Sequence, residues 1–104
     1  MAHNVAQYEL VSSGITAISM PKRARVLAVG CTAQGKPILM ASVENNADTR
    51  AFDTGQHQRH FDVIGVGDEI PADGQLVGMA THHKPAKPTQ FLLVYEVPGI
   101  RGPR

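Results

Sequence analysis

The chain has 104 residues, with ten Lys and Arg against nine Asp and Glu, and a formal net charge of +1 at pH 7. This length predicts a single domain that buries roughly 65% of its unfolded surface, enough for one small core. The balanced charge excludes the markedly basic character typical of strong nucleic-acid binding. A hydrophobic content of 42% excludes an intrinsically disordered chain.

Aromatic residues and cysteine are scarce. Without Trp and with only five aromatic residues, the core must rest on Val, Ile, Leu, Met and Ala, and so lean a core favours homo-oligomerisation. The single Cys excludes an intramolecular disulfide and fits a reducing cytosol. The first ten residues do not resemble a signal peptide, and no apolar run has the roughly eighteen residues of a membrane helix. We therefore expect a cytoplasmic protein.

Short apolar runs alternate along the chain with Gly, Pro and Asn, a pattern typical of strands and turns. No stretch repeats apolar residues at helical spacing over more than one turn, which argues against a helix of any length. Strands are expected at residues 5–10, 14–21, 24–33, 37–44, 49–54, 59–66, 76–82 and 89–97.

Several strands show which residues share a face. Residues 24–33 are apolar in both phases, with Leu27, Val29 and Cys31 on one face and Val26 and Ala28 on the other, which predicts a central strand covered on both sides. A hairpin turn is expected at 33–36, where Gly35 can adopt a positive φ.

In two further expected strands, apolar residues recur at every second position. In residues 37–44, which follow the hairpin turn, they are Leu39, Ala41 and Val43, and in residues 89–97 they are Phe91, Leu93, Tyr95 and Val97.

These elements predict an all-β fold, a compact antiparallel sandwich or partly open barrel of six to eight short strands. Residues 1–97 form one domain in this prediction, residues 82–88 form a Pro-containing loop, and residues 98–104 form a flexible C-terminal tail.

Residues 15–44, "ITAISMPKRARVLAVGCTAQGKPILMASVE", resemble the opening of a family of small phage and prophage proteins without an assigned activity. Members of that family run I-x-M/I-P-x-x-A-x-I/V-L-x-V into a hairpin and a second strand. The pieces "RHFDVIGVGDEIP", "QLVGMA" and "FLLVYEV" follow in the family's order. Where the family has G-T-G followed by His, this chain has Gly65, Val66, Gly67 and Asp68, and its final strand lacks the family's His. The resemblance implies a fold and no named activity.

Histidines and glycines raise the question of a metal or phosphate site. His57 and His60, with His82 and His83, could supply four zinc ligands, but Arg59 would repel a dication, and residues i and i+3 of a strand face opposite ways. The alternative, polar residues at a strand end, is favoured.

The segment at 65–69, "GVGDE", could form a backbone nest for phosphate. Its own two acids oppose an anion there, and a dinucleotide fingerprint would need a third Gly and a helix. A glycine bend that ends a strand is favoured. Cys31, within an apolar strand, is interpreted as a structural thiol rather than a nucleophile.

Basic and histidine side chains near predicted strand ends form the candidate binding set. If the strand ends converge at one rim, these residues form a site for an anion such as a nucleotide phosphate, and a homo-oligomer multiplies them. Each one taken alone also fits an ordinary solvated surface. The candidate ligand-binding residues are Arg25, Arg50, His57, Arg59, His60, His82 and Lys84.

We expect a non-enzymatic binding protein without a cofactor or metal, working as a homo-oligomer. Together with the habits of small phage proteins, the resemblance implies an anti-defence protein that sequesters a nucleotide immune signal between subunits. The alternative is a protein-interaction module, virion-associated or an inhibitor of a host enzyme, in which an edge strand such as Val5–Leu10 pairs with a partner's sheet. An enzyme acting on a phosphodiester would require the histidines to converge.

Overall fold

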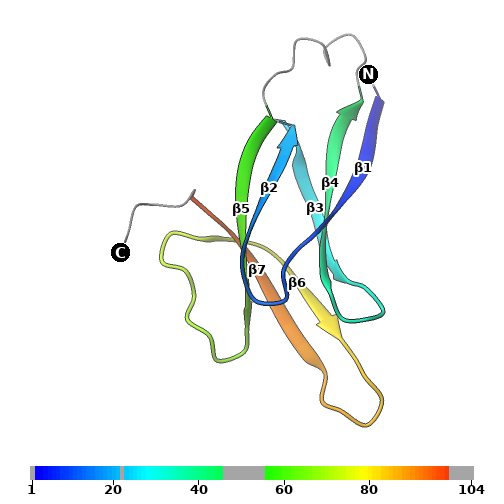
Figure 1. The fold of residues 1–104 in the computed structure, drawn as a ribbon, viewed down its shortest axis with the longest axis vertical. Helices are drawn as coiled ribbons and strands as arrows, with labels where there is room; N and C mark the ends of the chain where they lie inside the picture. Colours follow the sequence, from blue (N-terminus) through cyan, green and yellow to red (C-terminus); the bar gives the residue numbers. More distant parts are fainter. Residues whose placement is uncertain (1, 22, 46–55, 99–104) are drawn as a thin grey trace.

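The computed structural model describes residues 2–21, 23–45 and 56–98, and these form seven strands and no helix (Figure 1). The strands are β1 (Ala2–Glu9), β2 (Gly14–Pro21), β3 (Arg25–Cys31), β4 (Pro37–Asn45), β5 (Gln56–Gly65), β6 (Gln75–His82) and β7 (Gln90–Val97). The all-β prediction is confirmed. The strand expected at 49–54 lies outside the described residues.

The strands form two antiparallel sheets, which are not closed into a barrel. One sheet has the order β1-β4-β3 and the other the order β2-β5-β7-β6. Register pairs Tyr8 with Leu39 in the first sheet and Thr16 with Phe61 in the second. The extents of 50 × 37 × 17 Å fit two layers, because stacked sheets lie about 10 Å apart and outer side chains add the remainder.

The core lies between the two sheets. Most strands contribute every second side chain to it. Leu39 and Ala41 of β4 are fully buried, which confirms their predicted shared face, and Val43 is partly buried beside them. The buried cluster consists of Leu10, Ile18, Met20, Ala24, Leu39, Ala41, Phe61, Val63, Leu92 and Val94. Apart from the Phe61 ring, this core is built from aliphatic and Met side chains, as the composition predicts.

Strand β3 differs from its prediction as a central strand. It lies at an edge of its sheet, and a bulge between Val26 and Ala28 leaves Leu27 without a cross-strand partner. Because the bulge shifts the phase, Val26 packs with Val29 against the core, while Leu27 is 55% exposed. The predicted division of faces and the central position are therefore wrong.

The edge strands β3 and β6 run against each other and join the two sheets on one side. At Gly78 an added Cβ would lie 2.7 Å from Cγ2 of Val29, so the close approach needs a glycine. The predicted hairpin between β3 and β4 is confirmed, with the Thr32 amide donating to the Lys36 carbonyl and Gly35 at φ 88°. In residues 2–21, 23–45 and 56–98 there is no helix able to cross a membrane.

Candidate binding surface

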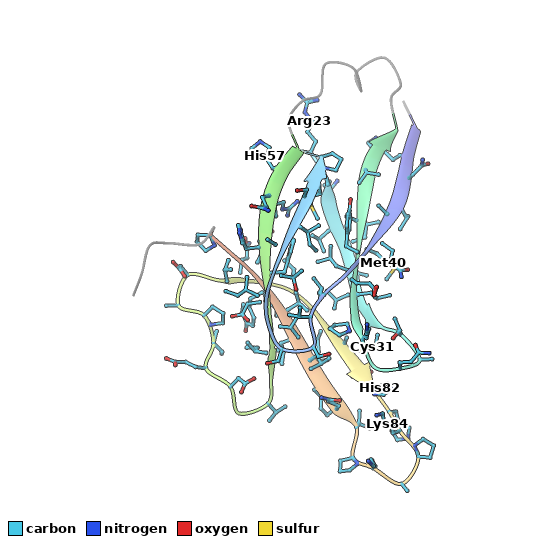
Figure 2. All side chains as sticks on the ribbon, viewed as in Figure 1. Arg23, Cys31, Met40, His57, His82 and Lys84 are labelled. Atoms are coloured by element: carbon cyan, nitrogen blue, oxygen red, sulfur yellow. The ribbon has the colours of Figure 1, made fainter. Side chains whose placement is uncertain are left out.

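The sequence-predicted ligand residues divide between the two ends of the molecule. Figure 2 shows His57 at one end and His82 and Lys84 at the other. Register gives the same result, because β7 pairs with His60 at Val97 and with His82 at Gln90. Seven residues of strand separate those positions, roughly 23 Å. The single rim on which these residues would converge is not formed by the described members of the set, and Arg50 lies outside the described residues.

Arg59 is committed to an internal network. Its guanidinium forms two 2.7 Å hydrogen bonds to the Glu96 carboxylate, and Nη1 also donates to the Ala24 carbonyl at 2.8 Å. The same group lies 5.6 Å from the centroid of the Phe61 ring. Hydrogen bonding to Glu96 raises the pKa of Arg59. Arg59 therefore connects β5, β7 and the turn before β3, and it is already neutralised by an acid.

His60 and His82 are both buried. His60 lies in mid-sheet, between its cross-strand partners Ala17 and Val97. The His82 ring packs on the β3–β4 turn, with Nε2 3.3 Å from the Ala33 carbonyl oxygen, and a Cβ at Gly35 would lie 2.7 Å from its Nδ1. His82 is thus a contact between the two sheets, and neither ring is presented to a soluble anion.

The histidines do not gather into a metal or catalytic site. His57 and His60 follow each other at i and i+3 on β5, while Nδ1 of His83 hydrogen-bonds Oγ1 of Thr89 at 2.8 Å near the far end. Within the described part of the chain, no three His, Cys, Asp or Glu side chains are placed to hold a metal ion. Cys31 is half-buried, and burial raises the pKa of its thiol, which disfavours the nucleophilic thiolate.

The segment after β5 is a turn that supplies its own anion. The Asp68 carboxylate accepts a 2.8 Å hydrogen bond from the Gly65 amide, and the Asp68 amide donates back to the Gly65 carbonyl at 3.1 Å. Gly67 has a φ of 95°, which the turn requires. These hydrogen bonds confirm a glycine bend after β5, and the Gly65 amide is occupied by Asp68.

The outer face of the β2-β5-β7-β6 sheet carries several exposed apolar side chains. On β5, Phe61 and Val63 point into the core, so the alternate residues point outward, and register carries this assignment to the neighbouring strands. We call the resulting set the outer apolar face: Ile15, Ile64, Leu76, Met79, Phe91, Leu93, Tyr95 and Val97.

Four members of the outer apolar face are strongly exposed. Leu76 and Met79 on β6 are 53% and 55% exposed, Ile15 on β2 is 51% exposed and Phe91 on β7 is 42% exposed. Four strands about 4.8 Å apart, over some six residues each, span roughly 400 Å² of sheet. The exposed apolar area is only part of this, because Ile64 is 7% exposed and Asp62 lies on the same face. Neighbouring exposed apolar residues on a monomer often mark an interaction site.

Asp62 is the one acid in this face. It is paired with Ile15 on one side and with Tyr95 on the other, and it is half-buried. Burial, and secondarily the nearby Asp68 carboxylate, raises the pKa of Asp62. No hydrogen bond or ion pair to Asp62 occurs within the described ranges, so its charge is poorly compensated in a mostly apolar surface.

The other sheet presents a more mixed outer surface. Its outward positions include Val5, Ile38 and Met40, but Gln7 and Glu9 on β1 interrupt them. Arg25, which is exposed, starts β3 on the same side. The outer apolar face is therefore specific to the four-stranded sheet.

The sequence indicated part of this face without indicating its orientation. Phe91, Leu93, Tyr95 and Val97 share a face as predicted, but it is the outer one, because Leu92 and Val94 fill the core. Apolar residues in both phases of this strand were the available sign. Comparisons with protein families, curated proteins and solved structures found no match.

Proposed function

We propose that the chain is a non-enzymatic binding protein that recognises a polypeptide through the outer apolar face. The observation that carries the proposal is the exposure of Ile15, Leu76, Met79 and Phe91 on one sheet whose opposite side already packs on the core. A sheet needs only one buried face for stability, so apolar residues on the second face favour a partner.

Charge specifies the chemistry of that partner. Asp62 lies inside the face, and Asp68 is close enough to raise its pKa. A complementary surface would be apolar and would place one Lys or Arg opposite Asp62, because a buried charge needs an opposite charge. The resemblance to phage and prophage proteins supports a host or virion protein as the partner, met in the host cytoplasm.

Substitution of Met79 by Glu tests this proposal. The change places a charge in the outer apolar face without altering the core, and we expect it to abolish capture of the partner from host-cell extract. Val66→Glu is the matched control, since Val66 is 81% exposed on the loop outside the face and adds the same charge. Proteins retained by wild type and Val66→Glu, but lost with Met79→Glu, are then purified and titrated calorimetrically.

The titration decides the outcome. A purified partner whose affinity falls at least about tenfold with Met79→Glu supports the proposal, because a buried unpaired charge costs more than 1.4 kcal/mol. Equal affinity for the two variants would place the binding surface elsewhere.

Sequestration of a nucleotide is the second candidate, and one observation favours it. Arg23 and His57 are exposed and lie at one end of the molecule (Figure 2), and the exposed Arg25 starts β3 two residues after Arg23. Among the described residues, none of the three takes part in a hydrogen bond like those that occupy Arg59. Cationic side chains that share an end attract a phosphate, and an oligomer would bring more of them together.

This candidate predicts thermal stabilisation by one of a panel of cyclic and linear nucleotides, with the nucleotide recovered unchanged after denaturation. Arg25→Ala combined with His57→Ala should remove the shift, while Lys84→Ala at the opposite end should retain it. No shift with any nucleotide, or a shift that only Lys84→Ala removes, would exclude this end as the anion site.

A further inference from the structure

Strand β2 is an edge strand with neither a bulge nor a charged side chain, and its one protective residue, Pro21, lies at its end. It pairs with β5 on one side only. The edge strands β3 and β6 each carry a bulge and run against each other, which protects them from foreign strands. Strand β2 pairs with β5 over eight consecutive residues without a bulge.

The composition of β2 gives it no charge to repel another strand. Its residues, "GITAISMP", contain no Lys, Arg, Asp or Glu, whereas the other unbulged edge strand, β1, ends in Glu9. Besides its ladder with β5, this strand accepts a hydrogen bond from the Val11 amide at Oγ1 of Thr16, one from the Ala24 amide at the Pro21 carbonyl, and one from Nη1 of Arg59 at Sδ of Met20. Of these, only the Ala24 bond occupies a backbone group of the strand, at its Pro21 end. The outward backbone groups of an edge strand remain available for pairing.

Charge at the two ends of β2 selects an antiparallel partner strand. Arg23 follows the Pro21 end, and Asp62 pairs with Ile15 near the other end, where the loop with Asp68 and Glu69 begins. A twofold axis through the middle of β2 would place the basic end of one copy beside the acidic end of the other. A parallel arrangement would align like charges.

We infer that β2 pairs antiparallel with β2 of a second copy of the chain, which joins two four-stranded sheets into one of eight strands. Directly opposed residues share a face, so a symmetric register must centre on a residue such as Ala17 or Ile18. Either register keeps Ile18 and Met20 on the core side and unites the two outer apolar faces. This inference needs no foreign partner and does not rest on the proposed function.

Ala17→Lys tests the inference. Ala17 is exposed near the middle of β2, so two lysines would meet directly or diagonally across the twofold axis. We expect wild type to sediment as a dimer and Ala17→Lys to raise the dissociation constant at least about tenfold. The control is Thr81→Lys, which adds the same charge to the same face on β6 and should change the constant less than about twofold.

Hydrogen exchange of the wild-type protein gives a second measurement. It needs no variant, so its result does not depend on whether a substituted chain folds. Amides of residues 14–20 should exchange more slowly as the protein concentration rises, while those of β6 should not. A monomeric wild type, or a dimer that Thr81→Lys weakens as much as Ala17→Lys, would overturn the inference. Met79→Glu distinguishes the two proposals. If this variant still dimerises but no longer captures a partner, the dimer and the partner-binding face are separate features.

Discussion

Asp62 should make the folded protein less stable as the pH rises through its titration range. Burial raises its pKa, so the folded state binds the proton more tightly than the unfolded chain does. The stability from this proton is therefore complete below the unfolded pKa of about 3.9 and is lost as pH rises through the folded value. We expect Asp62→Asn to melt at a higher temperature than wild type at neutral pH, with a weaker dependence on pH above 4.

Thermal melts of wild type and Asp62→Asn across this pH range check the prediction. Glu69→Gln is the control, because it removes an exposed acid from the following loop without changing the sheet. Parallel pH profiles for wild type and Asp62→Asn would show that the proton on Asp62 is not linked to folding.

The role of Arg59 could not be predicted from the sequence. Its type and its place near a strand end fit an anion site, but its partner Glu96 lies 37 positions away and becomes adjacent only when β5 pairs with β7. No local pattern distinguishes a free arginine from one held by a distant acid. The burial of His82 has the same origin, since it depends on the β3–β4 turn.

The junction of β3 and β6 should be sensitive to a single methyl group. In Gly78→Ala the new Cβ would lie 2.7 Å from Cγ2 of Val29 and 3.1 Å from its Cβ, so the strands must separate or the valine must move. We expect the free energy of unfolding, measured with urea, to fall by about 1–3 kcal/mol. In Gly30→Ala, the control on β3, the nearest atom lies 3.7 Å away, an ordinary contact.

A second substitution identifies the cause. If the clash with Val29 is responsible, Gly78→Ala should cost less in a Val29→Ala background than in wild type, which a double-mutant cycle measures. Equal costs in the two backgrounds would assign the loss to the backbone of β6.

Strand positions were largely predictable from sequence, whereas their order in the sheets was not. Gly14–Pro21 and the β3–β4 hairpin were located correctly because turn residues and alternation are local properties. The bulge beside Leu27 could not be located, since it depends on the neighbour of β3. The interpretation of residues 24–33 as a central strand was wrong for a related reason. A strand with apolar residues in both phases can also lie at the edge of its sheet, where another sheet packs beside it.

The two-rimmed shape of the sandwich explains why the sequence predicted a single anion site that the structure does not form. Sandwich strands end at two rims, and the sequence does not show which rim each strand end reaches. Figure 2 shows the consequence, with His57 and His82 at opposite ends. The outer apolar face, in contrast, combines residues from four strands, and it becomes recognisable only when register shows which phase fills the core.

The distance along the chain between β2 and its partner also affects how the protein is made. Paired residues of β2 and β5 are between 35 (Pro21 to Gln56) and 49 (Gly14 to Val63) positions apart. At ribosomal rates of 5–20 residues per second, β2 waits roughly 2–10 s for each partner residue to be synthesised. Throughout that time an uncharged apolar strand is exposed on both edges. Nascent chains on neighbouring ribosomes could pair through it, so a chaperone that shields Gly14–Pro21 during synthesis would raise the yield of folded protein.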